Sequence, residues 1–192
     1  LPPEVAGVLQ LAAVVGLEVD LDLLIRCRAD PAEVVLDRCE QLVAAGLLVE
    51  SDLPGSFAFG HRITREVIHD SLGRSRRAVL HRTVGDALRS MPSASGRHRS
   101  VAEHYHRAGS SFVALAVEHQ IDAGAESLAQ SAWGLAEGLF AAAASSIRTE
   151  DEVPDAPRLL ANALVGLGEA RLGGGDRAGA KAALEEAVAI AR

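Results

Sequence analysis

The chain has 192 residues, 48% of them hydrophobic and 3% aromatic, and its formal net charge is −7. The apolar share is too high for a disordered chain. The acidic charge and the few aromatic residues argue against nucleic-acid binding through bulk positive charge or base stacking. The longest apolar runs are about half a membrane span, so no membrane association is expected.

Two further features bear on the setting of the chain. Cys27 and Cys39 are the only cysteines. They are too few for a disulfide framework and predict a reducing, cytoplasmic location. The sequence begins with Leu1 instead of methionine, and we therefore expect it to be a fragment of a longer protein. Its length allows one or two small domains.

The N-terminal part predicts three helices, because alanine and leucine dominate and apolar residues recur at helical spacing. Prolines suit a first helical turn, and a glycine suits a helix end. Asp30 before Pro31 has the form of an N-cap followed by a first-turn proline. The three expected helices run from Pro2–Pro3 to Gly16, from about Asp20 to Arg28, and over Pro31–Ala45 up to Gly46.

The next segment changes its period. A short strand at 47–50, a turn at 52–55 and a returning strand at 57–59 predict a β-hairpin. Three helices followed by a small hairpin form the winged-helix pattern. Helices are expected to resume over 61–71 and 75–91. We therefore predict a first domain over residues 1–91.

Residues 92–99 are small, polar and basic and predict a linker or loop. Residues 100–192 predict a helical array. Its breaks are expected near Gly109, near Gly124, within Thr149–Pro157 and at Gly173–Gly175. The predicted fold class is therefore mainly α: a winged-helix domain with a small β-hairpin, followed by an α-helical tetratricopeptide-like array.

The repeat signal is strongest at the C-terminal end. Leu-Gly, a turn glycine, and small and large residues on the following helix match the tetratricopeptide spacing. The residues concerned are Leu167, Gly168, Gly175, Asp176, Ala180, Leu184 and Ala187. Weaker echoes are Ala102, Tyr105, Gly109 and Ala114, and then Ala136, Phe140 and Ala143. The intervals are irregular, so a plain alanine-rich bundle is the alternative.

No catalytic constellation is evident. Gly174–Lys181 resembles a phosphate-binding loop only superficially, because Ala180 separates Gly179 from Lys181 and Ala182 replaces the hydroxyl residue. Histidines are seven in number, but His104 and His106 point to different helix faces, and no zinc-type spacing surrounds His69 or His81. We therefore expect no enzyme activity, no metal site and no cofactor in this chain itself.

Charge also argues against DNA binding by the predicted third helix. Its acidic Glu33, Asp37 and Glu40 outnumber Arg38, and such a surface repels phosphate. A basic stretch lies elsewhere and is expected to form a solvated helix face with acidic partners. It comprises Arg74, Arg76, Arg77 and Arg82.

Two stretches carry a family resemblance: FAFGHRITREVIHDSLGRSRRAVLHRTVGDAL at 57–88 and AEHYHRAG at 102–109. Together they resemble the region that follows the ATPase core in STAND-class signalling ATPases of actinobacteria. That class includes LuxR-type large ATP-binding transcription regulators and related cyclase-linked proteins. The resemblance implies a cytoplasmic regulator of transcription whose parent protein binds ATP or ADP.

The resemblance also implies a role for His61. In the family, a histidine at the strand-to-helix junction contacts the ADP β-phosphate within a Met-His-Asp motif. Here the corresponding residues are Gly60, His61 and Arg62. A donor near a helix N-terminus suits an anionic phosphate. The alternative is that His61 only caps or anchors the helix that follows the wing.

The chain is therefore interpreted as a non-catalytic regulatory fragment. Its winged helix would help the adjacent ATPase domain of the same chain to hold ADP. Its helical array would receive an unknown inducer or protein partner. The alternatives are an interaction scaffold without a nucleotide link and a DNA-binding winged helix with a sensor domain.

Overall fold

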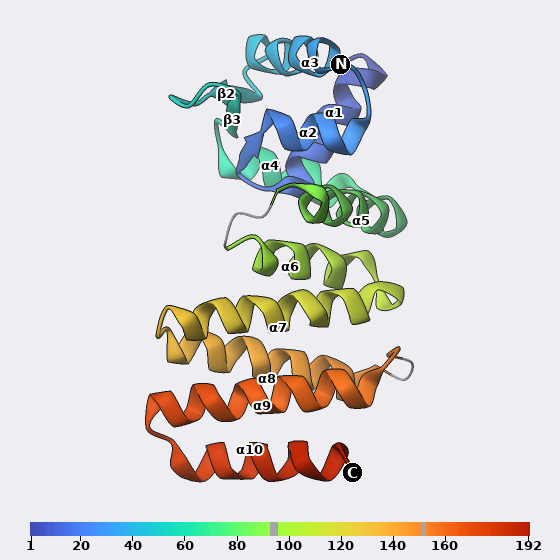
Figure 1. The fold of residues 1–192 in the computed structure, drawn as a ribbon. Coiled ribbons are helices and arrows are strands. Elements are labelled where there is room, and N and C mark those ends of the chain that lie inside the picture. Colours follow the sequence, from blue (N-terminus) through green and yellow to red (C-terminus); the bar gives the residue numbers. More distant parts are fainter. Residues whose placement is uncertain (93–95, 151–152) are drawn as a thin grey trace. The chain divides into compact units, whose positions relative to one another are not determined.

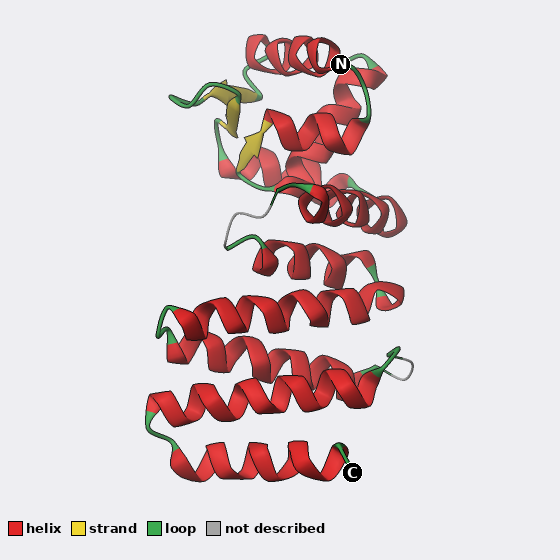
Figure 2. Cartoon of the chain, viewed as in Figure 1, coloured by secondary structure: helices red, strands yellow, loops and turns green. Residues whose placement is uncertain are grey.

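The computed structural model describes residues 1–92, 96–150 and 153–192 (Figure 1). Helices dominate, and a small antiparallel sheet of three strands lies in the N-terminal part (Figure 2). This confirms the prediction of a mainly helical fold. The chain divides into two compact units, Leu1–Ser90 (unit 1) and Met91–Arg192 (unit 2). None of the helices in the described ranges is long and apolar enough to cross a membrane.

Unit 1 combines five helices with the sheet. In chain order its elements are α1 (Pro3–Val15), β1 (Glu18–Asp20), α2 (Leu21–Arg28), α3 (Ala32–Ala44), β2 (Leu48–Glu50), β3 (Ser56–Phe59), α4 (Arg62–Ser71) and α5 (Arg74–Ser90). Helix α1 contacts α2, α3, α4 and α5, and its apolar residues Val8 and Ala12 are fully buried. It is therefore the central helix of this unit.

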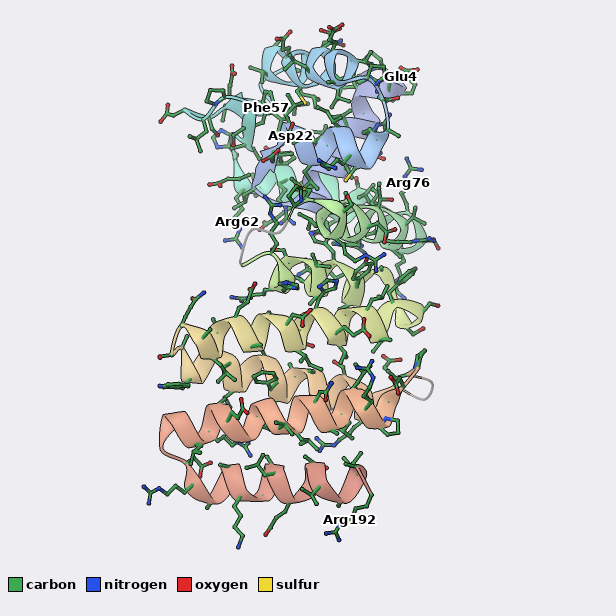
Figure 3. All side chains as sticks on the ribbon, in the orientation of Figure 1. Glu4, Asp22, Phe57, Arg62, Arg76 and Arg192 are labelled. Atoms are coloured by element: carbon green, nitrogen blue, oxygen red, sulfur yellow. The ribbon has the colours of Figure 1, made fainter. Side chains whose placement is uncertain are left out.

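The sheet has the order β1-β3-β2, with β3 in the middle. Val19 pairs with Phe57, and Leu48 pairs with Phe59. All four of these side chains are buried, so one face of the sheet contributes to the core. Figure 3 shows Phe57 directed into unit 1, whereas Arg62 and Arg76 extend from its surface.

Two expectations for unit 1 are corrected. Strand β1 is an element that the sequence pattern does not predict, because it is only three residues long and has no apolar run. It pairs with β3, about 40 positions later in the chain. Asp30 does not cap α3, whose N-cap is Pro31 without a capping side chain. Instead, the Asp30 carboxylate accepts hydrogen bonds from Arg28 and Arg38. The carboxylate is thus engaged in two charge-assisted hydrogen bonds instead of capping the first backbone amides of α3.

Unit 2 is a succession of helices, each packed against the next along the chain (Figure 1). They are α6 (His98–Ala108), a 3₁₀ turn (Ser110–Phe112), α7 (Val113–Ala129), α8 (Trp133–Thr149), α9 (Ala156–Gly174) and α10 (Arg177–Ile190). Helix α7 also contacts α9. Short loops thus place neighbouring helices side by side, as in helical repeat proteins.

Small residues set the helix spacing in unit 2. A Cβ at Gly124 of α7 would lie 2.7 Å from the Phe140 ring, and one at Gly166 of α9 would lie 2.3 Å from it. A Cβ at Gly168 would lie 2.7 Å from Leu184. Each glycine therefore admits a large side chain of a neighbouring helix. This is the close approach that the repeat interpretation requires, although the tetratricopeptide assignment itself stays a prediction.

Several predicted boundaries in unit 2 are revised. Gly124 is not a break but a buried residue inside α7, because its missing side chain admits Phe140. The break that precedes α8 lies at Gln130–Ala132, where Ser131 has a φ of 57°. The predicted linker 92–99 is too long, since α6 begins at His98. Of that segment, 93–95 lie outside the described residues, as do 151 and 152 in the predicted break before α9.

Candidate functional site

His61 lies where the sequence predicts a junction between strand and helix. It follows β3 by two residues and is the N-cap of α4, with an extended backbone at φ −139° and ψ 130°. The residue is exposed, and its side chain makes no capping hydrogen bond. The imidazole therefore does not cap α4, and the ring is accessible to a ligand.

Helix α4 is anchored on one side and exposed on the other. The Arg65 side chain donates from Nε to the carbonyl oxygen of Ala13, 3.0 Å away, which ties α4 to the end of α1. On the exposed side, Ile63 and Val67 are 69% and 64% accessible. They are four residues apart and so share one helix face. An exposed apolar pair beside His61 is a candidate contact surface for another domain.

The charged residues of unit 1 are arranged as expected for a solvated surface. Arg38, the one arginine of α3, forms an ion pair with Asp30 and is occupied within the unit. Glu33, Asp37 and Glu40 are exposed on the same helix. In the basic stretch, Arg77 pairs with Asp70 at 3.7 Å and Arg82 pairs with Asp86 at 3.5 Å. Arg74 and Arg76 are exposed.

The glycine-rich segment 174–181 is a turn between two helices. Gly175 has a φ of 92° at the end of α9. The Asp176 carboxylate accepts a hydrogen bond from the Gly179 amide and so caps α10. Lys181 lies one turn later and pairs with Glu185 at 3.7 Å. The local geometry thus accounts for the segment as a helix hairpin.

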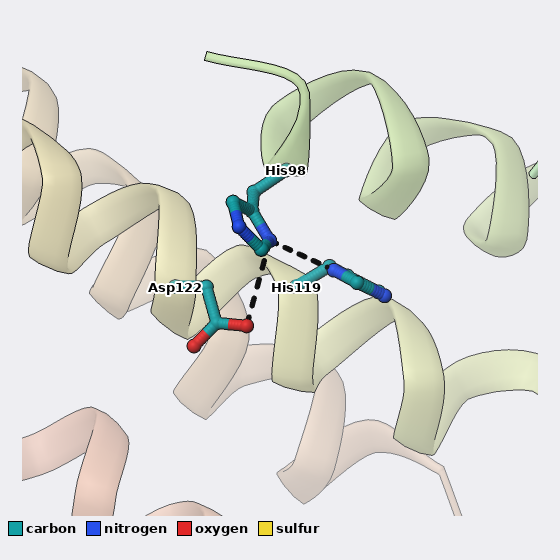
Figure 4. Close-up of side chains that lie close together, drawn as sticks. All are labelled: His98, His119 and Asp122. Carbon is teal, nitrogen blue, oxygen red and sulfur yellow. Dashed lines mark hydrogen bonds and ion pairs between the residues drawn. The ribbon is translucent and has the colours of Figure 1, made fainter. Parts of the chain in front are cut away.

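A second cluster, which the sequence analysis did not identify, lies between α6 and α7 (Figure 4). It consists of His98, His119 and Asp122, each of which offers one ligand atom within 4.8 Å of the others. The two Nδ1 atoms of the histidines are 2.9 Å apart. The Nδ1 atom of His98 is 3.5 Å from Oδ2 of Asp122. Two imidazoles and a carboxylate are ligands that first-row divalent metals accept.

The helices place these groups without distorting the backbone. His119 and Asp122 are three residues apart on α7 and therefore share a face, and His98 is the first residue of α6. Glu126, one turn beyond Asp122, accepts a hydrogen bond from the Gly96 amide at 3.0 Å. Its other oxygen lies 3.8 Å from Nε2 of His98. Glu126 thus anchors the backbone just before His98.

Burial perturbs three titratable groups elsewhere. Desolvation lowers the pKa of His104, which is 6% exposed on α6, to about 4. Burial raises the pKa of the Cys27 thiol to about 12 and that of Cys39 to about 11, with Glu40 adding to the latter. These thiols are protonated at neutral pH, and their low nucleophilicity argues against a catalytic cysteine.

An open groove of about 590 Å³ lies on the surface of α10. Exposed apolar side chains of Leu172, Leu184 and Val188 contribute to its lining. Charged residues that also line it are Arg177, Lys181, Glu185 and Arg192. The groove thus brings apolar and charged side chains together on one surface.

The sequence contained part of the signal for the cluster between α6 and α7. The spacing of His119 and Asp122 is visible within a clearly helical segment. The third member, His98, falls in the segment 92–99 that the sequence predicts to be a linker, whereas the structure places it at the start of α6. The histidines that the sequence pattern brings forward lie outside the cluster. His69 and His81 meet edge to face with ring centroids 6.1 Å apart, and His106 contacts Gln120.

The chain is similar to "Uncharacterized protein R02095" of Rhizobium meliloti (strain 1021), at 32% identity over 192 aligned residues that cover 96% of this chain. The chain spans only 18% of the length of that relative. No family model matches the chain, and no solved structure matches it.

Proposed function

We propose that this chain is a regulatory, non-catalytic part of a larger STAND-class signalling ATPase that regulates transcription in the cytoplasm. In this proposal, unit 1 helps an adjacent ATPase domain to retain ADP through His61. Unit 2 receives an inducer or partner protein. Binding there shifts the equilibrium between a resting and an active state, which requires the ligand to prefer one state.

The position of His61 carries the proposal. The imidazole is exposed at the N-terminus of α4, where the helix dipole and backbone amides favour an anion. The exposed apolar pair of Ile63 and Val67 lies on the same helix and supplies a surface for the ATPase domain. The length of the relative is consistent with such a sequence being embedded in a much longer protein.

Unit 2 supports the sensing role by its architecture. Stacked helices present extended surfaces for partners, and the groove on α10 is lined by both apolar and charged side chains. An interaction scaffold without a nucleotide link would use the same surfaces. The two functions therefore differ only in what His61 does.

The experiment is a measurement of bound nucleotide in the complete protein. We expect the purified wild type to retain ADP and His61→Ala to lose it roughly tenfold to a hundredfold faster, as for the loss of one hydrogen bond to a charged group. Nucleotide released by heat denaturation is quantified by anion-exchange chromatography, and its dissociation is followed by chase with unlabelled ADP.

His69→Ala, eight residues later in unit 1, is the matched control and is expected to retain ADP like the wild type. Because His61 is exposed, its replacement should leave the thermal unfolding midpoint unchanged. Equal ADP retention by wild type and His61→Ala would reject the phosphate role and favour the scaffold. Duplex DNA binding by the complete protein that disappears on charge reversal of Arg74 and Arg76 would favour the DNA-binding alternative.

A further inference from the structure

We propose that His98, His119 and Asp122 form a binding site for a divalent transition-metal ion, with Zn²⁺ as the ion that fits best. The site lies within unit 2, between the first turn of α6 and the middle of α7 (Figure 4). It is independent of His61 and of any nucleotide.

Two of the three distances between ligand atoms are close to those in a zinc coordination sphere. With bonds of 2.0–2.1 Å, the ligand atoms of a tetrahedral site are about 3.3 Å apart. The contacts of His98 Nδ1 with His119 Nδ1 and with Asp122 Oδ2, at 2.9 and 3.5 Å, bracket this value. The ligand atoms of His119 and Asp122 lie within 4.8 Å of each other, so that side-chain rotation would close the third edge of the site around an ion. Three protein ligands leave a fourth position for water.

The nitrogen of His98 that faces away from the other two ligands has a carboxylate beside it. Oε1 of Glu126 lies 3.8 Å from Nε2 of His98. Nδ1 of His98 is the ring nitrogen that faces His119 and Asp122, and its lone pair is the one that would bind the ion. A carboxylate behind a ligating histidine is the usual second-shell arrangement at zinc sites.

His119 is held by an aromatic stack. Its ring centroid is 6.2 Å from that of Tyr105, and Tyr105 is in turn 6.0 Å from Phe112, with near-parallel planes in the second pair. Tyr105 is fully buried. The imidazole is therefore positioned by packing before a metal arrives, which lowers the entropic cost of binding.

The ligand types narrow the identity of the ion. Two imidazole nitrogens favour zinc, copper, nickel or iron over magnesium and calcium, which prefer oxygen ligands. Because the ligands come from two helices, the bound ion would fasten the start of α6 to α7. The inferred role is thus a structural or regulatory clamp within the helical array.

Titration of the 192-residue chain with Zn²⁺ against a chromophoric chelator tests the site. We expect one ion per chain and a higher thermal unfolding midpoint when the ion is present. His119→Gln and Asp122→Asn are each expected to weaken binding at least about tenfold, and Glu126→Gln by a similar factor through His98. Co²⁺ should give visible d–d bands without a thiolate charge-transfer band, since no cysteine belongs to the site.

His106→Gln is the matched control, because His106 lies on α6 outside the cluster and contacts Gln120. It should bind Zn²⁺ like the wild type. Circular dichroism of each metal-free variant establishes that its helices are intact. The proposal would be overturned if the wild-type chain bound no Zn²⁺ at about 1 mM metal, a 100-fold molar excess over the chain. Undiminished binding by the folded His98→Gln/His119→Gln double variant would also overturn it.

Discussion

Replacing Phe140 by alanine is expected to lower the free energy of unfolding of unit 2 by about 3–5 kcal/mol. The side chain is 2% exposed and belongs to a core cluster with Leu164, Leu167 and Ala170. Its ring fills the space above Gly124 of α7 and Gly166 of α9. Truncation would therefore leave a cavity that three helices border, and glycine offers no side chain to fill it. Chemical denaturation followed by circular dichroism measures the change.

A double-mutant cycle separates this packing from general damage. Gly166→Ala alone places a methyl group against the Phe140 ring and is expected to destabilise by about 1–3 kcal/mol. In the Phe140→Ala background the same change should be neutral or stabilising, because the ring is gone. Leu135→Ala, at a 47% exposed position of α8, is the control and should cost less than about 1 kcal/mol. Additive effects of the first two changes would contradict the assignment.

Acidification is expected to destabilise unit 2 through His104. Its pKa in the folded protein is lowered from 6.5 to about 4 by burial, so between these two values the unfolded chain binds more protons than the folded one. The contribution of neutral His104 to the free energy of unfolding is fully present above pH 6.5 and is lost as the pH falls from 6.5 to 4. A shift of this size corresponds to about 3 kcal/mol. Denaturation midpoints measured across this range test it.

His104→Gln removes the titration and keeps a polar side chain. Its stability should be lower at neutral pH but should vary less between pH 6.5 and 4 than that of the wild type. His106→Gln, on the same helix, is the control and should give the same pH profile as the wild type. Parallel profiles for the wild type and His104→Gln would show that another group governs the acid response.

The parts of the fold that follow local patterns could be read from the sequence. Helix periodicity, the prolines at the start of α1 and the hairpin of β2 and β3 are all encoded within short windows. Where long-range packing decides, the pattern was insufficient. Gly124 has the form of a helix breaker, but α7 continues through it because Phe140, 16 residues later in the chain, occupies the space that its hydrogen leaves. Asp30 has the form of an N-cap, but two arginines engage its carboxylate.

The two candidate sites also differ in whether a local pattern or long-range packing determines them. His61 was identified by resemblance, and its exposed position at the start of α4 is a property of the local junction; its nucleotide role stays a prediction. The cluster of His98, His119 and Asp122 depends on α6 returning against α7. The side chain of His98 meets the other two only through that helix pairing. The spacing of residues in the sequence therefore indicates only His119 and Asp122, the two members on α7.

The pairing of β1 with β3 also distinguishes the two units in how they reach their folds. Glu18 must find Ala58 across the whole of α2, α3 and β2, whereas the main helix contacts of unit 2 join neighbours in the chain. Folding slows as contacts become more distant in sequence, because a longer loop must close before any contact forms. Unit 2 is thus built for rapid, stepwise assembly. Unit 1 must wait for its central strand before its sheet can close.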